Sequence, residues 1–320
     1  MTRSAGPHTS GAGAPGTHPL GTPPAAAAAD RADDVRRRVE SHGLSHAGLV
    51  RPANEDHFVV ASLQRSVQVR QTNLDDPGVL ERLCGPMAYV FAVADGVGGV
   101  TGGAMASGLA VASIVEYLSQ TVGSYHAVPP GQEHDFLGPL TAAVERAHER
   151  LRGTFAAATG APAPAAGHSA ERQGPATTLT LALLVWPQVY LVHVGDSRAY
   201  HLRAGALTRL TRDQTMGAYL VARQALSEQQ AERAGLNHVL ASAIGAPDMT
   251  PAVGVLDVAP GDVLLLCTDG LTRHVEDAEI AEVLGGAGDA ESSCRRLVER
   301  ALAGGGRDNV TVVVARALAP

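Results

Sequence analysis

The chain has 320 residues, of which 45% are apolar but only 3% aromatic, so a sizeable core must be built mainly from Ala, Val and Leu. The net charge of −7 argues against a nucleic-acid surface, and no run approaches the roughly 18 apolar residues of a membrane helix. The three cysteines are widely spaced, which indicates neither a disulfide framework nor a zinc site and suits a reducing cytoplasm.

The first 40 residues predict a disordered tail. They are rich in Gly, Ala, Pro and Thr, and such a composition buries too little apolar surface to offset the entropy of ordering. Residues 30–40 carry charge at nearly every position, which fits either a short solvated helix or the end of the tail, and we favour the tail. The folded domain is then expected over residues 41–320, with its first core residues near Ser45.

The first half of the domain contains two strand patterns and two helix patterns, in this order: strands over 57–63 and 87–94, then helices over 104–122 and 136–158. The second helix has an apolar face of Leu140, Val144, Ala147 and Leu151. The segments 65–85 and 160–174 have no clean period and predict an insertion and a flexible loop.

The second half predicts three consecutive strands followed by mixed elements, in this order: strands over 177–186, 189–194 and 198–203, short helices over 216–226 and 227–234, a strand over 262–268, helices over 275–284 and 290–303, and a strand over 309–316. The separators Pro187-Gln188 and Gly195-Asp196-Ser197 have the length of hairpin turns. Because strands come in runs and helices in pairs, the pattern favours antiparallel sheets with segregated helices.

Acidic residues stand at the ends or starts of five apolar strands: Asp95, Asp196 and Asp269 at strand ends, each beside a glycine, and Glu55-Asp56 and Asp308 before strand starts. A single Asp-Gly pair is usually a turn. In antiparallel sheets, however, the end of one strand lies beside the start of its neighbour, so all of these acids can meet at one rim. Oxygen-only ligands favour Mg²⁺ or Mn²⁺, and a crowded acidic rim needs such cations.

Other chemistries are less well supported. Arg51 precedes Glu55 and Asp56 by four and five residues, where its guanidinium could hold a phosphate beside a metal, although a lone arginine is usually a surface charge. The glycine-rich loop after Asp95 lacks the Lys-Ser/Thr of a Walker motif. No Cys-x-x-Cys pair is present, and His42 and His46, although four residues apart, lie at the domain entrance, so zinc is not indicated. Ser197 is not in a Gly-x-Ser-x-Gly elbow, so a serine hydrolase is not favoured.

Taken together, these segments resemble the metal-dependent protein phosphatases of the PPM, or protein phosphatase 2C, type in their bacterial form. The resemblance covers about residues 45–317. It implies an α+β fold, a four-layer αββα sandwich of two antiparallel sheets flanked by helix pairs, with a binuclear Mn²⁺ or Mg²⁺ centre at one rim. The matching segments, in family order, are 51–56, 93–99, 176–179, 194–200, 207–213, 243–245, 267–271 and 307–311.

For the first metal site, the resemblance implies that Asp95 bridges both ions and that Asp269 and Asp308 complete the coordination. It also implies a possible third ion, held by Asp196 together with Asp269, as in bacterial relatives.

For the second site, the resemblance implies Asp56 and the carbonyl of Gly96, with Glu55 as the alternative acid. It assigns substrate phosphate binding to Arg51. Val97 stands where many eukaryotic relatives carry a candidate acid, histidine, so protonation of the leaving group has no assigned residue. Residues 214–241 correspond to the variable flap beside the active site.

The implied reaction is hydrolysis of phosphoserine and phosphothreonine in proteins, by direct attack of a water molecule activated by two metals and without a phosphoenzyme. The expected setting is a cytoplasmic monomer that opposes a Ser/Thr kinase. Two alternatives stay open. One is a non-catalytic regulatory module of the same fold. The other is a phosphatase dedicated to one regulatory partner, such as an anti-sigma-factor antagonist.

Overall fold

The computed structural model describes residues 39–65, 70–71, 75, 85–98, 102–121, 136–159 and 174–318. The predicted tail up to residue 38, most of the predicted insertion over 65–85 and nearly all of the predicted loop over 160–174 lie outside the described residues.

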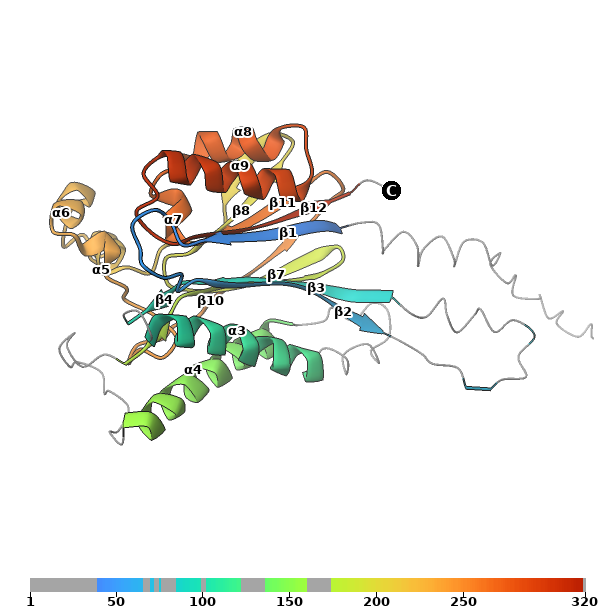
Figure 1. Ribbon diagram of the computed structural model, residues 1–320, viewed down its shortest axis with the longest axis horizontal. Coiled ribbons are helices and arrows are strands. Elements are labelled where there is room, and N and C mark those ends of the chain that lie inside the picture. The colour runs from blue at the N-terminus through green and yellow to red at the C-terminus, as the bar shows by residue number, and fades with distance from the viewer. Residues whose placement is uncertain are drawn as a thin grey trace, which may run out of the picture.

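Two antiparallel sheets stack face to face, and a pair of helices covers the outer face of each (Figure 1). The strand order is β1-β12-β11-β8-β9 in the first sheet and β10-β7-β6-β3-β2 in the second. The helices α8 and α9 lie over the first sheet, and α3 and α4 lie over the second. The predicted fold class, an αββα sandwich, is confirmed.

The first sheet consists of β1 (Val39–His46), β8 (Arg198–Arg203), β9 (Ala206–Arg209), β11 (Val263–Cys267) and β12 (Val310–Ala317). Its central strands β11 and β12 are buried along almost their whole length. Each is apolar on both faces because one face meets the helices and the other meets the second sheet.

The second sheet consists of β2 (His57–Arg65), β3 (Gly85–Ala94), β6 (Leu179–Val185), β7 (Gln188–Val194) and β10 (Ala252–Asp257). A separate two-stranded pair, β4 (Gly96–Val97) and β5 (Ala176–Thr177), continues beyond the end of β3. The space between the two large sheets is filled by apolar side chains from both, including Phe91, Leu266 and Val313.

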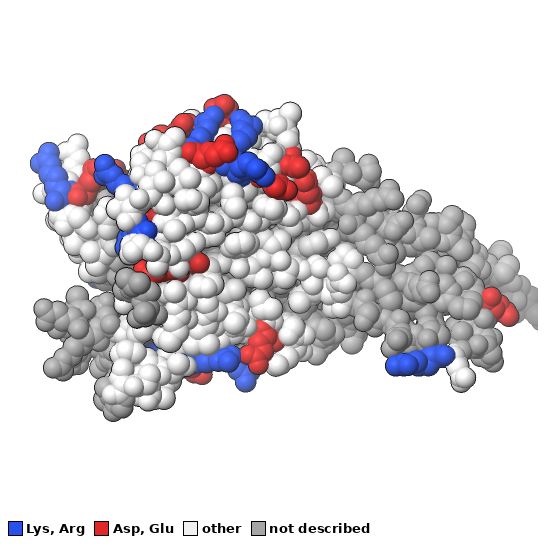
Figure 2. All heavy atoms as spheres, in the orientation of Figure 1, with Lys and Arg blue, Asp and Glu red and all other residues white. Residues whose placement is uncertain are grey.

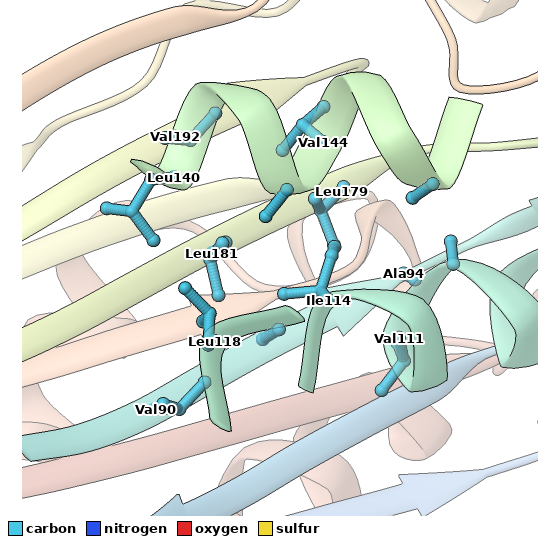
Figure 3. Packing of buried hydrophobic residues seen from close by; sticks show 14 of the residues in the cluster. Val90, Ala94, Val111, Ile114, Leu118, Leu140, Val144, Leu179, Leu181 and Val192 are labelled. Atoms are coloured by element: carbon cyan, nitrogen blue, oxygen red, sulfur yellow. The ribbon is translucent and has the colours of Figure 1, made fainter. Parts of the chain in front are cut away.

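Two long helices, α3 (Gly102–Thr121) and α4 (Leu137–Thr159), form the outer layer of the second sheet. The predicted apolar face of α4 is fully buried, and Leu140 and Val144 pack with Ile114 of α3 and Leu181 of β6 (Figure 3). The small buried residues of α3, such as Ala106 and Ala110, let this helix lie close to the sheet.

The outer layer of the first sheet consists of α8 (Asp277–Gly285) and α9 (Ala290–Ala303), preceded by one turn, α7 (Asp269–Thr272). Charged side chains of both signs gather over α8 and α9 (Figure 2), where Arg300 pairs with Glu279 and Glu282. Residues 214–241, called the flap below, contain α5 (Met216–Ala222), α6 (Glu228–Arg233) and the 3₁₀ turn η3 (Leu236–His238). None of the helices among the described residues is long and apolar enough to span a membrane.

Several sequence predictions need correction. Strand β1 begins at Val39, so the expectation that the core starts near Ser45, after a tail extending to residue 40, is wrong. This strand was missed because the residues around its start are highly charged, yet all eight of its residues, Val39 to His46, pair with β12. Strands β9 and β10 were not predicted, since both are short and only partly buried.

The prediction that Gly195-Asp196-Ser197 forms a hairpin turn is also wrong. Strand β7 belongs to the second sheet and β8 to the first, so these three residues carry the chain across the sandwich. The predicted strand over 177–186 is broken at Thr178, between β5 and β6. Both irregularities lie at the rim where the acids gather, so the backbone departs from regular pairing at the candidate site.

Candidate active site

The strand ends and starts singled out by the sequence meet at one end of the sandwich. A cavity of about 720 Å³ opens there, and its lining includes these five acids: Glu55, Asp95, Asp196, Asp269 and Asp308. The sixth predicted acid, Asp56, does not line the cavity but is buried, with 5% exposure. Arg51 and Gly96 line the cavity too. The fold therefore brings together all eight residues that the sequence proposed, from both sheets.

The backbone of Asp95 is fixed by two threonines just before β6. The N–H of Asp95 donates to Thr178 Oγ1 at 3.0 Å, and the carbonyl of Asp95 accepts from Thr178 N and Thr177 Oγ1, both at 2.9 Å. Thr178 also hydrogen-bonds the hydroxyl of Ser197 at 2.8 Å. Asp95, directly after β3, and the crossover that carries Asp196 are thus joined through Thr178.

Two glycines permit this crowding. A Cβ on Gly96 would collide with the carbonyl of Gly103, because the start of α3 lies directly against the loop. Gly195 has φ of +106°, and a Cβ there would lie 2.6 Å from Thr178 Cγ2. Only glycine adopts this conformation without strain, so Gly195 sets where the chain turns toward Asp196.

Asp56 is held by hydroxyl groups from the first sheet. Thr268 Oγ1 and Thr311 Oγ1 donate to Asp56 Oδ2 at 2.9 and 2.7 Å. Thr311 also contacts Ser45 Oγ at 2.7 Å, and Asn54 Nδ2 donates to Ser45 Oγ at 2.8 Å. These positioning residues were not predicted, because a threonine inside an apolar strand gives no sequence signal of its partner.

Glu55 lies on the cavity side of the same loop. Its N–H donates to Asn309 Oδ1 at 2.9 Å, and Asn309 Nδ2 donates to the carbonyls of Ala47 and Ala53. Asn309 therefore ties the β1–β2 loop to the start of β12. The Glu55 carboxylate and the Gly96 carbonyl both lie within 2.8 Å of where a Cβ on Gly103 would stand. Glu55 Oε1 and the Gly96 carbonyl thus share one corner of the site.

Two arginines pair with the acids at the cavity. Arg51 Nε and Nη2 donate to Asp308 Oδ1 and Oδ2 at 2.8 and 2.9 Å. Arg273 Nη1 donates to Asp308 Oδ2 at 2.8 Å, and its Nη2 pairs with Asp269. Arg51 was predicted to be near the acids and Arg273 was not. Arg273 follows Asp269 by four residues, a spacing at which two side chains on a helix can pair, and this spacing was visible in the sequence.

The ionised forms of these acids are disfavoured, because the carboxylates are buried and repel one another. Burial first, and neighbouring carboxylates next, raise the pKa of Asp95 well above its ordinary value. Burial likewise raises the pKa of Asp56 to about 7 and that of Asp196 to about 7. Burial raises the pKa of Asp269 as well, although Arg273 opposes the shift. Such perturbed groups in a cleft mark a functional site.

The residues present suit divalent cations. Glu55 Oε1, Asp56 Oδ1 and Asp269 Oδ1 are buried without a hydrogen-bond partner, which is costly unless a ligand satisfies them. The six predicted acids outnumber the two arginines at this rim, and a further acid, Asp248, also lines the cavity, so the site has an excess of negative charge that divalent cations would offset. Carboxylate and carbonyl oxygens are the ligands that Mg²⁺ and Mn²⁺ prefer.

Within the described ranges, no group of three or more acidic, histidine or cysteine side chains is arranged to hold a metal ion as it stands. Two of the acids are instead paired with arginines, Asp308 with Arg51 and Arg273, and Asp269 with Arg273. For these two carboxylates to hold an ion, they would have to exchange a guanidinium for the metal. The donor set fits the group that the sequence implied, once that exchange is made.

The flap forms the opposite wall of the cavity. Met216, His238 and Val239 line it, and Val239 is 47% exposed. Gln214, at the start of the flap, accepts from Gly195 N through Oε1 at 3.0 Å and donates to the Thr250 carbonyl at 3.0 Å. The flap is thereby attached to the crossover that carries Asp196, and His238 is a cavity histidine that the sequence did not single out.

A family profile described as Protein phosphatase 2C matches residues 66–304. The chain belongs to the protein phosphatase 2C family. The serine/threonine protein phosphatase PstP of Mycobacterium tuberculosis is 36% identical over 228 residues, which are 71% of this chain and 40% of PstP. The chain thus spans less than half the length of that curated relative.

One further relative and one solved structure extend the comparison. The serine/threonine phosphatase stp of Listeria monocytogenes is 29% identical over 248 residues, 77% of this chain and 91% of stp. The crystal structure of the PstP catalytic domain in complex with two manganese ions superimposes with a TM-score of 0.64 and 31% identity, covering 88% of this chain and 99% of that domain. The chain therefore shares its fold with a relative, PstP, whose catalytic domain was solved in complex with two manganese ions.

Proposed function

We propose that this protein hydrolyses phosphoserine and phosphothreonine in other proteins, with two Mn²⁺ or Mg²⁺ ions at the acidic rim and a third beside Asp196. The observation that carries the proposal is the set of buried carboxylate oxygens without partners beside a cavity of about 720 Å³ that also contains Arg51. Divalent ions at such a centre lower the pKa of water and stabilise the charge on a transferred phosphoryl group.

Asp95 is the proposed bridge between two ions, and its backbone clamp supports that role. Its carbonyl and N–H are both fixed by Thr177 and Thr178, so its carboxylate projects from a rigid point. Asp269 and Asp308 would complete the first site, and Asp269 with Asp196 would hold the third ion. All four acids line the one cavity.

The second site uses the Gly96 carbonyl with Glu55 or Asp56. Glu55 lines the cavity, whereas Asp56 is buried behind it and already accepts two threonine hydroxyl groups. This arrangement favours Glu55 as the acid that reaches the cavity. Asp56 then contributes through its remaining oxygen, Oδ1, which has no hydrogen-bond partner.

Arg51 is proposed to bind the substrate phosphate. Its side chain is 48% exposed and its present partner is Asp308, a proposed metal ligand. When Asp308 binds a cation instead, the guanidinium is free to bind two phosphate oxygens in the same cavity. Val97, 45% exposed at the cavity wall, has no proton to give, so the proton for the leaving group comes from water.

The alternatives receive less support. A non-catalytic module of this fold has no need of a complete acidic rim, whereas all six proposed acids are present here. A phosphatase dedicated to one partner would show fast turnover of that phosphoprotein and none of generic peptides. The proposal further includes a cytoplasmic monomer that opposes a Ser/Thr kinase. A reducing compartment is supported by the unpaired, buried Cys267 and Cys294.

The test is a phosphothreonine peptide assay with titrated Mn²⁺. Asp95→Asn and Asp269→Asn are expected to reduce phosphate release to the assay background while thermal unfolding remains cooperative. Glu291→Gln, an exposed acid on α9, is the control and should hydrolyse the peptide at the wild-type rate. Undiminished hydrolysis in excess chelator, or by Asp95→Asn, would contradict the proposal.

A further inference from the structure

A second cavity, of about 730 Å³, adjoins the acidic site. Four residues line both cavities: Asp196, His238, Asp269 and Arg273. One wall of the second cavity is the β8–β9 edge of the first sheet, and the other is the flap, through α5, α6 and η3. A substrate bound with its phosphorylated side chain in the first cavity would therefore have neighbouring side chains beside the second.

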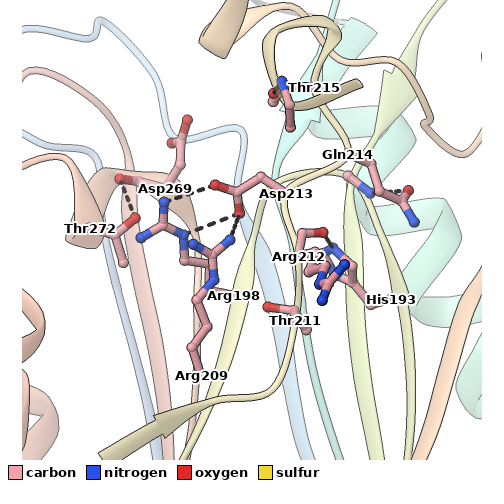
Figure 4. A network of polar contacts seen from close by, with 12 residues as sticks. His193, Arg198, Arg209, Thr211, Arg212, Asp213, Gln214, Thr215, Asp269 and Thr272 are labelled. Atoms are coloured by element: carbon pink, nitrogen blue, oxygen red, sulfur yellow. Dashed lines mark hydrogen bonds and ion pairs between the residues drawn. The ribbon is translucent and has the colours of Figure 1, made fainter. Parts of the chain in front are cut away.

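Arginines dominate the wall that the sheet supplies. Arg198, Arg209 and Arg212 all line the cavity, with Asp213 among them. Arg198 Nε and Nη2 donate to Asp213 at 3.1 and 2.8 Å, and Arg209 Nη2 donates to the same carboxylate (Figure 4). One carboxylate thus serves two guanidinium groups, and a third stands beside them, so this wall keeps an excess of positive charge.

The donors of this cluster are not all used. Each nitrogen of Arg198 has a partner, since its Nη1 also donates to the Tyr200 hydroxyl at 3.3 Å. By contrast, Arg209 Nε is buried with no partner. Arg212 is exposed, and only its backbone carbonyl is engaged, by His193 Nε2 at 3.1 Å. The Arg212 guanidinium makes no ion pair among the described residues and is exposed, so it can bind an anion in the cavity without breaking an existing ion pair.

The acids around the cavity do not cancel this charge. Glu228 lies on the flap wall, while Asp196 and Asp269 belong to the proposed metal centre. With those two acids neutralised by cations, the three arginines of the sheet wall outnumber the two remaining acids, Asp213 and Glu228. Every basic group here except histidine is a guanidinium, because the sequence contains no lysine. Guanidinium pairs two donors with the two oxygens of a carboxylate or phosphate.

We propose that this arginine cavity binds a second anionic group of the substrate, a carboxylate or a phosphate monoester, on a side chain close in sequence to the phosphorylated residue. The inference rests on the proposed phosphatase function and adds a substrate preference to it. An extended chain advances about 3.3 Å per residue, and the two cavities share four lining residues, so the second anionic group is sought within roughly two to four residues of the phosphorylated one.

The test uses phosphothreonine peptides of one sequence with Gln, Glu or phosphoserine placed two, three or four residues to either side. Both kcat/KM and binding by fluorescence anisotropy are measured with the Mn²⁺-loaded full chain. We expect the Glu or phosphoserine peptide at one spacing to have about 5- to 10-fold higher kcat/KM and affinity than the Gln peptide. A gain with phosphoserine alone assigns the site to phosphate, and a gain with both assigns it to anions in general.

The variants are Arg212→Gln, Arg209→Gln and their combination, with Arg295→Gln on α9 as the control. Arg212→Gln and the double variant should lose the preference through KM, while kcat on the Gln peptide stays unchanged. If Arg209→Gln lowers the unfolding temperature, the exposed Arg212 carries the test alone. No preference at any spacing, or one that the double variant retains, would overturn the inference. The anisotropy measurement tests the inference even if no peptide is hydrolysed. A lack of hydrolysis would count against the phosphatase function only.

Discussion

Replacing Arg273 with glutamine should weaken the metal-free protein and strengthen its binding of metal. Arg273 pairs with Asp269 and Asp308, which are both proposed metal ligands. Without metal, the guanidinium offsets the repulsion between these carboxylates. A divalent ion bound by the same two acids must displace it. Removing Arg273 therefore destabilises the metal-free state alone and should leave the loaded state nearly unchanged.

The size of the effect follows from burial. The side chain of Arg273 is 33% exposed, while those of Asp269 and Asp308 are 11% and 14% exposed. Exposed pairs contribute about 0.2–1 kcal/mol, and breaking a fully buried pair costs about 3–5 kcal/mol. We expect an intermediate loss of about 1–2 kcal/mol, discounted for solvent screening. In a domain of this size, that loss lowers Tm by roughly 2–8 °C. By linkage, the same free energy makes the Mn²⁺ affinity about 5- to 30-fold tighter.

The assay is thermal unfolding in chelator and across a Mn²⁺ titration, with calorimetry for the affinity. Arg295→Gln is a matched control, because Arg295 pairs with Glu291 at the same i, i+4 spacing but both side chains are more than half exposed. That variant should change neither quantity measurably. If Arg273→Gln unfolds at the wild-type temperature in chelator and binds Mn²⁺ with unchanged affinity, the competition between guanidinium and metal does not exist.

Three further predictions concern the support of the site. Thr311→Val removes the hydroxyl donor to buried Asp56 at 2.7 Å and should cost about 1–3 kcal/mol in urea unfolding with chelator present; an unchanged midpoint would exclude this role. Gly195→Ala forces φ of +106° on alanine and places its Cβ against Thr178, so a loss of about 2–4 kcal/mol is expected, and wild-type stability would refute the steric argument. Because burial raises the pKa of Asp56 and Asp196 from 3.8 to about 7, the native state binds more protons than the unfolded state between about pH 4 and pH 7. The metal-free protein should therefore lose stability as pH rises through this window, and saturating Mn²⁺ should reduce the loss; equal pH profiles with and without Mn²⁺ would contradict it.

Periodicity and turn chemistry were enough to predict most of the elements. The apolar face of α4 is buried as its spacing required, and β3, β7 and β12 lie close to their predicted positions. Prediction failed where local pattern and tertiary contact disagree. Strand β1 follows a highly charged stretch and is only partly buried, so it forms because β12 offers it an edge.

The sequence predicted the acids that meet at the cavity, but not the residues that hold them in place. An acid beside glycine at a strand end leaves a local trace, and Asp95, Asp196 and Asp269 were found by it. Thr311 leaves none, because a threonine in an apolar strand looks like a core residue. Arg273 was overlooked as well, although its spacing from Asp269 was visible.

The sequence by itself determined which acids could meet at one rim, because acid, glycine and apolar strand are neighbours along the chain. Only the tertiary structure decided how they meet. Asp56 and Thr311 are 255 positions apart, yet their oxygens lie 2.7 Å apart across two sheets. The same three residues, Gly195 to Ser197, fit a hairpin or a crossover, and the choice depends on which sheet has a free edge for β8. Such pairings are settled by the burial of both sheets at once, which no local segment can encode.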